Sequence, residues 1–297
     1  MTQTHDVSYS ELDAVRQCRL KSYLAYHERW QPEKPSAALQ RGGLFHKVLE
    51  AHYSQKVTTL DSGGLKAAAD PWAILKAAED DYEEDIIDSV RWIYEGYLER
   101  YGADEHWEIL AVEQRVEEWL RLPNGRKSAY KLKGFVDLLV RDHSAGGGLF
   151  VVDHKTAREL PKQRALDFDD QMGIYVYLLR KAGHDIRGVI YNACRSYQLK
   201  REMSLDERFQ RSLTVRTDRE LQTMADEALR TFKSAYGERV GGQSEGDKAA
   251  ILPPRSPNPD TCGWRCSYTE ACLMSRKGKD IRGLLSEMGY TQQLKRH

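Results

Sequence analysis

Apolar residues recur at helical spacing through the first hundred residues of the chain. This pattern predicts a first helix over residues 11–30, capped by Ser10 and ended by the segment QPEKPS, and a second helix over residues 37–53. Residues 54–70 are expected to form a loop. An acidic helical region follows, and its charges are expected to form a solvated face. Its apolar positions lie on the opposite face: Ile86, Val90, Ile93 and Tyr97.

The period then shortens to that of β-strands. Strands are predicted over residues 107–122, over residues 134–157 as two strands joined by the turn DHSAGGG, and over residues 186–197. Helices are predicted over residues 163–183, with Gly183 as the C-terminal cap, and over residues 218–236. Residues 241–260 are predicted to be flexible. This order of helices, strands, helix, strand and helix predicts a mixed α/β core without internal repeats.

Composition narrows the class of protein. The chain has 297 residues, of which 30% are charged, and its formal net charge is zero, so nucleic-acid binding would have to come from local patches. The absence of a long apolar run or of a secretion signal predicts a soluble, cytoplasmic protein without membrane contact. An odd count of five cysteines argues against a disulfide framework.

The predicted hairpin carries charges where apolar residues would pack better. Asp137 and Asp153 are symmetric about residue 145, so an antiparallel pairing would place them opposite each other. Two carboxylates that close repel, and a divalent cation between them would reverse the sign of that interaction. Lys155 shares a strand face with Asp153, whereas His154 points to the other face. A surface salt bridge is the alternative interpretation of these charges.

These residues also carry a family resemblance. GFVDLLV, followed sixteen residues after its aspartate by DHKT, resembles motifs II and III of the PD-(D/E)XK nuclease superfamily. Val136 stands in place of the proline, as in the RecB-like branch. Three other elements resemble that branch, and they stand in the expected order: RGGLFHKVLEAHY with His46, VEQRV with Glu113, and QMGIY with Gln171 and Tyr175. Glu117 or Glu118 would replace Glu113 if the strand register differed.

The resemblance implies a restriction-endonuclease-like mixed sheet flanked by helices, and a site for Mg²⁺ or Mn²⁺. The implied metal ligands are His46, Asp137, Asp153 and the carbonyl of His154. Lys155 would orient or activate the attacking water and stabilise charge in the transition state. Glu113, Gln171 and Tyr175 complete the implied catalytic set. Arg158, Lys162 and Arg164 are expected to contact the DNA backbone, or else to be ordinary solvated cations.

The cysteines suggest a second cofactor. Cys262, Cys266 and Cys272 follow a C-x3-C-x5-C pattern, and Cys18 is the distant fourth thiol. This arrangement resembles the iron–sulfur nucleases, which include CRISPR-associated RecB-like exonucleases, their phage-borne relatives and the AddB nuclease domain. The resemblance implies a 4Fe–4S cluster that joins the N- and C-terminal segments; zinc and unligated thiols are the alternatives. Cys194 alternates within a strand and is predicted to be a small core residue.

The sequence therefore predicts a single nuclease domain over residues 1–297, with a helical part (1–105), a core (106–240) and a cysteine-cluster segment (241–297). The expected function is a metal-dependent DNA exonuclease that prefers single strands or ends, in recombination, repair or CRISPR and phage DNA processing. The expected location is a bacterial or phage-infected cell, and a recombination or CRISPR-associated protein is a possible partner. A structure-selective endonuclease and a DNA-binding adaptor remain alternatives. The first helix carries cations beside Tyr23, Tyr26 and Trp30, a mix that suits phosphate contacts and base stacking, with Tyr23 as the predicted DNA-binding aromatic; such groups can also simply lie at the surface. No P-loop is present.

Overall fold

The computed structural model describes residues 4–57, 69–102, 104–240 and 252–293. The chain forms two compact units. Unit 1 comprises Met1–Pro35, Trp119–Leu132 and Asp226–His297, and unit 2 comprises Ser36–Glu118 and Lys133–Ala225. Much of the predicted loop at 54–70 and of the predicted flexible stretch at 241–260 lies outside the described residues. Each unit is taken by itself below.

A six-stranded sheet has the strand order β1-β4-β5-β6-β7, and β3 pairs with β4. The strand bounds are His5–Ser8 for β1, Trp107–Arg121 for β3, Lys127–Asp142 for β4, Gly148–Ala157 for β5, Ile186–Arg195 for β6 and Phe209–Thr214 for β7. The pair β5/β6 is parallel, whereas β4/β5 and β6/β7 are antiparallel. The sheet is therefore mixed, as predicted.

The hairpin β4–β5 has the predicted register. Leu138 pairs with Val152 and Asp142 with Gly148, so Asp137 and Asp153 occupy the next position along the same register. The turn between the strands needs glycine, because Gly146 and Gly147 both adopt positive φ angles of 68° and 72°. The glycine-rich turn therefore sets which residues of the two strands face each other.

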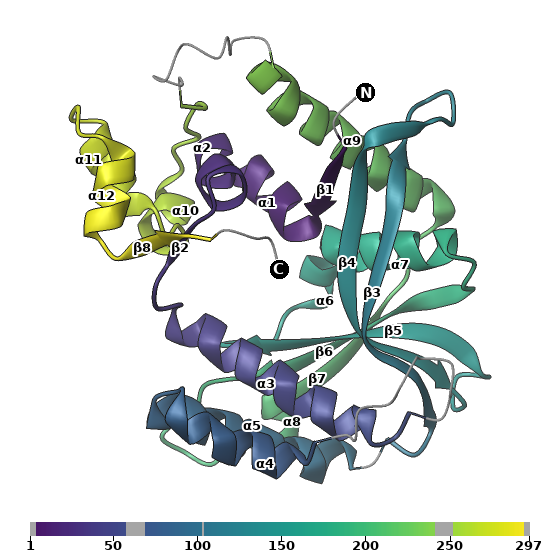
Figure 1. Ribbon diagram of the computed structural model, residues 1–297. Coiled ribbons are helices and arrows are strands. Elements are labelled where there is room, and N and C mark those ends of the chain that lie inside the picture. Colours follow the sequence, from purple (N-terminus) through teal and green to yellow (C-terminus); the bar gives the residue numbers. More distant parts are fainter. Residues whose placement is uncertain (1–3, 58–68, 103, 241–251, 294–297) are drawn as a thin grey trace. The chain divides into compact units, whose positions relative to one another are not determined.

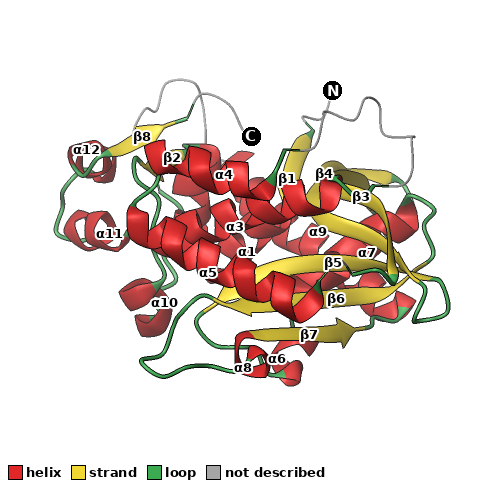
Figure 2. Cartoon of the chain, turned by 90° about the horizontal axis from the view of Figure 1, so that it is seen from below, coloured by secondary structure: helices red, strands yellow, loops and turns green. Residues whose placement is uncertain are grey.

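Helices cover both faces of the strands β5, β6 and β7 in unit 2 (Figures 1 and 2). Helix α3 (Ala37–Ser54) and helix α5 (Glu84–Tyr101) lie on one face, and α7 (Asp170–Lys181) lies on the other. The predicted acidic helix is confirmed, since the four apolar residues assigned to its inner face are fully buried: Ile86, Val90, Ile93 and Tyr97. Among the described residues, no helix combines the length and apolar character that a membrane span requires.

Other parts of unit 2 differ from the sequence prediction. The helix expected over residues 163–183 is two helices, α6 (Gln163–Asp167) and α7, because Asp169 caps a new helix by accepting a hydrogen bond from the Gln171 backbone. Helix α4 (Pro71–Ala77) and helix α8 (Leu205–Arg208) were not predicted, and the short 3₁₀-helix η2 (Ala78–Asp80) covers the start of the predicted acidic helical region. Strand β7 was not predicted either, since its inner face carries polar Ser212 while Leu213 is 52% exposed. Gly183 follows α7 with a φ of 96°, so the predicted cap is confirmed.

The first helix of unit 1, which follows strand β1, differs from the sequence prediction. Helix α1 (Tyr9–Gln17) is capped by Ser8 rather than Ser10, and it stops at Cys18, whose φ of −165° and ψ of 122° are extended. The chain resumes as α2 (Arg19–Ser22), a π-helical turn η1 (Tyr23–His27) and strand β2 (Trp30–Pro32). The single helix predicted over residues 11–30 is therefore broken at the cysteine.

The rest of unit 1 consists mainly of short C-terminal helices. These elements are α10 (Pro259–Trp264), α11 (Thr269–Ser275), α12 (Ile281–Glu287) and strand β8 (Tyr290–Gln292), which pairs with β2. Helix α9 (Asp218–Val240) contributes its later part. Leu20 and Leu24 form one hydrophobic core with Tyr268, Ile281 and other apolar residues of the C-terminal helices. Figure 1 shows α2 beside these helices, so the N-terminal and C-terminal segments of the chain build this unit together.

Candidate active site

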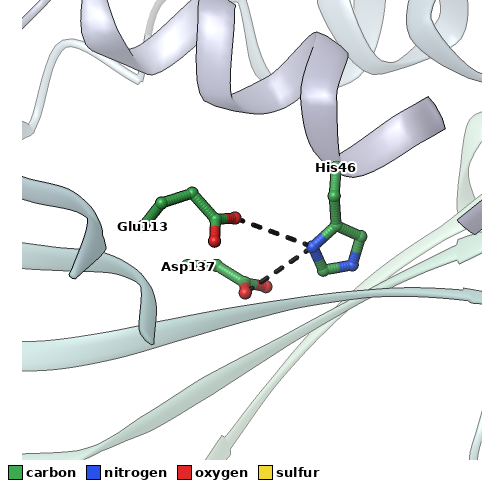
Figure 3. A group of neighbouring side chains, drawn as sticks. All are labelled: His46, Glu113 and Asp137. Atoms are coloured by element: carbon green, nitrogen blue, oxygen red, sulfur yellow. Dashed lines mark ion pairs between the residues drawn. The ribbon is translucent and has the colours of Figure 1, made fainter. Parts of the chain in front are cut away.

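Three side chains from three elements of unit 2 converge on one point (Figure 3). His46 comes from α3, Glu113 from β3 and Asp137 from β4. The Nδ1 atom of His46 lies 3.9 Å from Glu113 Oε1 and 3.6 Å from Asp137 Oδ1. One ligand atom from each residue falls within 4.8 Å of the others, which is a spacing that suits a single metal ion. An imidazole and two carboxylates are ligands that Mg²⁺ or Mn²⁺ accepts.

The backbone selects Glu113 from the glutamates of its strand. Glu113 has a φ of 47°, which is rare for a residue other than glycine and costs about 1–3 kcal/mol. Glu117 is occupied elsewhere, since it accepts a hydrogen bond from Arg115 at 2.7 Å. Glu113 is thus the glutamate of this strand that the structure places beside His46 and Asp137, and the strained backbone turns it there.

Asp153 and Lys155 form a second pair on strand β5. Lys155 Nζ donates to Asp153 Oδ1 at 2.8 Å. Asp153 is fully buried, and its other oxygen, Oδ2, has no hydrogen-bond partner among the described residues. An unsatisfied carboxylate oxygen in the interior is costly unless it has a further ligand. This orphaned oxygen fits a metal ion and does not fit a surface salt bridge, since neither oxygen of Asp153 is exposed.

The charged groups of the site shift one another's pKa values. Burial, and then the charge of Asp153, raise the pKa of Asp137 to about 7. Burial acts to lower the pKa of His46, but Glu113 and Asp137 outweigh it, so that pKa is raised. Burial likewise acts against the ammonium of Lys155, yet Asp153 and Asp137 raise its pKa. Two carboxylates in a buried site thus favour any added positive charge.

His154 points to the opposite face of the sheet, as its place between Asp153 and Lys155 predicts. Its backbone N–H donates to Asp137 Oδ2 at 2.7 Å, while its ring is buried against Tyr53. Burial lowers the pKa of this imidazole well below its usual value, so the ring is neutral. The side chain is therefore no ligand on the site's face, and metal binding by the His154 carbonyl stays a prediction.

Gln171 and Tyr175 lie one helical turn apart on α7 and form a hydrogen bond, with Gln171 Nε2 donating to Tyr175 Oη at 2.7 Å. Burial, and then Asp153, raise the pKa of Tyr175, which places its hydroxyl in the field of the carboxylates. Close packing against β4 requires glycine at position 134, because a Cβ there would lie 2.9 Å from Tyr175 Cε1. The glycine of GFVD thus lets this tyrosine approach the strand that carries Asp137.

The predicted DNA-contact residues have different surroundings. Arg158, Lys162 and Arg164 are exposed in unit 2, and the Arg158 guanidinium lies 5.3 Å from the centre of the Tyr197 ring. Tyr23, in unit 1, is only 7% exposed and belongs to the core. Tyr23 is therefore mostly covered by its own unit, and base stacking on its ring stays a prediction.

The four predicted cluster cysteines line one cavity of unit 1. Its volume is about 220 Å³, and its wall includes Cys18, Cys262, Cys266 and Cys272 together with Leu20 and Leu24. The Ser256 backbone N–H points at Cys18 Sγ at 3.5 Å, and the Asn258 N–H points at Cys262 Sγ at 3.5 Å. Cys194 is separate: it is fully buried in the core of unit 2, as predicted.

A family model of the PD-(D/E)XK nuclease superfamily matches residues 6–273. The chain belongs to this superfamily. The match spans both carboxylates of the hairpin, Lys155 and the helix with Gln171. The mixed sheet with helices on both faces fits the restriction-endonuclease-like fold of PD-(D/E)XK proteins. A nuclease function follows from this membership.

The solved structures that resemble this PD-(D/E)XK protein are similar to it only at a low level. An inferred exonuclease from Eubacterium rectale is 12% identical, with a TM-score of 0.47, and the match covers 87% of this chain and 92% of that one. A phage-related exonuclease from Haemophilus somnus 129PT is 14% identical, with a TM-score of 0.31, and the match covers 64% of this chain and 93% of that one. A search of curated proteins finds no significant match. The family assignment rests on the superfamily match alone.

The raised pKa of Asp137 predicts how pH affects the stability of the metal-free PD-(D/E)XK protein. The folded state holds this proton up to about pH 7, whereas the unfolded chain releases it near pH 4. Because the folded state binds more protons between these values, stability falls as pH rises from 4 to 7 and stays low above that. We expect Asp137→Asn to raise the free energy of unfolding of the metal-free protein at pH 8 by about 1–4 kcal/mol.

Urea denaturation at pH 5 and pH 8, with chelator and with saturating Mg²⁺, measures this effect. The gain from Asp137→Asn should shrink at pH 5, where the wild-type carboxyl is already protonated, and should shrink in Mg²⁺, which compensates the carboxylate. A variant less stable than wild type at pH 8 in chelator would contradict the assigned electrostatics.

Proposed function

We propose that this PD-(D/E)XK protein is a metal-dependent DNA exonuclease that acts on single strands or on DNA ends. The observation that carries the metal-dependent chemistry is the buried carboxylate pair of the hairpin β4–β5. One member, Asp137, lies beside His46 and Glu113, and the other, Asp153, holds an orphaned oxygen beside Lys155. A degenerate site, as in a DNA-binding adaptor, would have no reason to keep these charges buried together.

His46, Glu113 and Asp137 would hold Mg²⁺ or Mn²⁺, and Asp153, which is not one of the residues whose ligand atoms lie within 4.8 Å of one another, would face the ion with its orphaned Oδ2. Bound there, the ion would polarise the scissile phosphate and lower the pKa of a bound water. Lys155 would supply positive charge to the transition state. Because its pKa is raised, this lysine stays protonated, which favours charge stabilisation over the alternative role of proton acceptor. Tyr175 and Gln171, which are hydrogen-bonded to each other, would form the wall of the site on the side of α7.

We also propose that unit 1 holds a 4Fe–4S cluster between Cys18, Cys262, Cys266 and Cys272. Tetrahedral zinc with bonds of about 2.3 Å would bring its sulfurs to roughly 4 Å from one another. Among the described residues, the one group of three or more metal-ligating atoms within 4.8 Å is the His46 group, so no three cysteine sulfurs are that close. A cavity of about 220 Å³ between the thiols suits a larger cluster, and backbone N–H groups aimed at the sulfurs are typical of iron–sulfur sites.

The preference for single strands and ends is the property that the resembling RecB-like iron–sulfur nucleases imply. The cysteine-lined cavity supports that branch. A pathway in recombination, repair or CRISPR and phage DNA processing, with a protein partner from such a pathway, belongs to the same proposal.

Assays on three DNA forms test the proposed function. Protein purified without oxygen is incubated with end-labelled linear single strands, linear duplex and circular single strands, in Mg²⁺, in Mn²⁺ or in chelator. We expect linear single strands to be shortened from an end, circles to stay intact and chelator to stop cleavage. Cleavage of circles at the same rate would favour the endonuclease alternative, and no cleavage with either metal would overturn the nuclease proposal.

A further inference from the structure

A buried polar network lies behind the hairpin, on the face of the sheet that carries the His154 ring. Arg211, from β7, donates from both terminal nitrogens to Asp104, at 2.6 and 2.9 Å. Tyr53 Oη also donates to Asp104, at 2.6 Å. Asp104 is 4% exposed and holds a φ of 47°, a strained conformation. A buried ion pair seldom stabilises a fold by itself, so its presence here calls for another role.

The network fixes the orientation of Asn192, on β6. Arg211 has only donors, and its Nε lies 3.3 Å from Asn192 Oδ1, so the amide oxygen must face the arginine. The amide nitrogen then faces His154 Nδ1 at 2.7 Å and Tyr97 Oη at 3.1 Å. Since Asn192 Nδ2 can only donate, His154 Nδ1 must accept. The arginine thereby selects one tautomer and one ring position for His154.

The backbone of His154 also makes a contact on the opposite face of the sheet. The His154 backbone lies between Asp153 and Lys155, and its N–H donates to Asp137 Oδ2 at 2.7 Å. A rotation of this residue would therefore move both carboxylates of the hairpin relative to each other. The strand pairing of β5 with β6 places His154 directly beside Asn192, so the relay reaches His154 through neighbouring strands.

We propose that Arg211, Asp104 and Asn192 form a positioning relay that holds His154, and through its backbone the two hairpin carboxylates, in the geometry that binds the metal. These residues touch neither metal nor DNA. The inference deepens the proposed function and rests on it for its effect on catalysis, although metal binding can be measured without any turnover.

The decisive variant is Asn192→Asp. Its carboxylate still accepts from Arg211, so the fold is kept, but it requires a proton on His154 Nδ1 and so reverses that hydrogen bond. We expect Mn²⁺, measured by electron paramagnetic resonance of the free ion, to bind about 10–100-fold more weakly, with kcat reduced by a similar factor. KM for DNA should change by less than about threefold, because no DNA contact is lost. Nitrogen NMR of the His154 ring should show the changed tautomer.

Arg211→Lys is a second variant, since lysine keeps the charge but lacks the fork that binds Asp104 and Asn192 together. The matched control is Tyr101→Phe: this ring lies 3.6 Å from the Arg211 guanidinium, and its hydroxyl lies outside the relay. The control should bind Mn²⁺ as wild type does. Folded Asn192→Asp with Mn²⁺ affinity within about threefold of wild type would overturn the relay. If wild type binds Mn²⁺ but cleaves no DNA, the same titration still decides the relay while the nuclease proposal fails.

Discussion

Asp153→Asn should abolish cleavage while leaving the protein folded. Asparagine has the same shape but cannot supply the carboxylate charge, and we expect the rate of phosphodiester hydrolysis to fall by about 10³-fold or more. Stability should change little, because the neutral amide costs less to bury than the carboxylate with its unpartnered oxygen, and this gain offsets the lost ion pair with Lys155. Single-turnover cleavage of end-labelled DNA, together with thermal unfolding, measures both quantities.

Asp142→Asn is the matched control, at the other end of the same hairpin. Asp142 is a structural carboxylate that accepts hydrogen bonds from Trp107, from the Ser144 backbone and hydroxyl, and from Ala145. Its replacement should lower stability by about 1–3 kcal/mol and keep cleavage at a temperature where the variant is folded. Asp153→Asn should thus lose cleavage and keep its stability, whereas Asp142→Asn should lose stability and keep cleavage. Full activity in Asp153→Asn would refute the assigned site.

Cys18→Ala should remove the iron and the brown colour from anaerobically purified protein, and it should make unit 1 unfold. A ligated structural metal centre supplies on the order of 10 kcal/mol to a small unit. The core of unit 1 that surrounds the cysteines is made from short elements of the two terminal segments, so it has little else to hold it. Iron and sulfide content, visible absorption and protease resistance of residues 252–293 measure the change.

Cys194→Ala provides the comparison. This thiol is more deeply buried than that of Cys18, yet it lies in the core of unit 2 and lines no described cavity. We expect its iron content to match wild type, with a small loss of stability from the smaller side chain. Zinc in place of iron in the wild-type protein, or iron retained in full by Cys18→Ala, would show that the cluster is assigned wrongly.

Much of the site was predictable because strand alternation is local. The turn between Asp142 and Gly148 sets the register of the hairpin, and the register alone places Asp137 across from Asp153 and Lys155 beside it. Helical spacing likewise places Gln171 over Tyr175. These relations need only the residue count along one or two elements, so the sequence contains them.

Other features depend on the backbone conformation or on distant partners. Alternation along β3 cannot reveal that Glu113 turns through a positive φ to meet His46. Nothing near Cys18 in the sequence signals that the helix breaks there, because no proline or glycine marks the place. Asp104 and Arg211 are 107 residues apart, and only the fold shows that they pair. Strand β7 was not predicted because its buried positions include polar Ser212 and Thr214 while Leu213 is exposed.

The three-segment construction of unit 1 bears on the order in which the molecule is made. At roughly 5–20 residues per second, a ribosome needs on the order of ten to fifty seconds to pass from Cys18 to Cys262. Both segments of unit 2 have been synthesised once the ribosome passes Ala225. That unit can therefore fold before Cys262, Cys266 and Cys272, which line the cavity with Cys18, have been made. A newly made chain would therefore have a stage in which both segments of unit 2 are complete while Cys18 still lacks the other three cysteines, so insertion of the proposed cluster would be a late event.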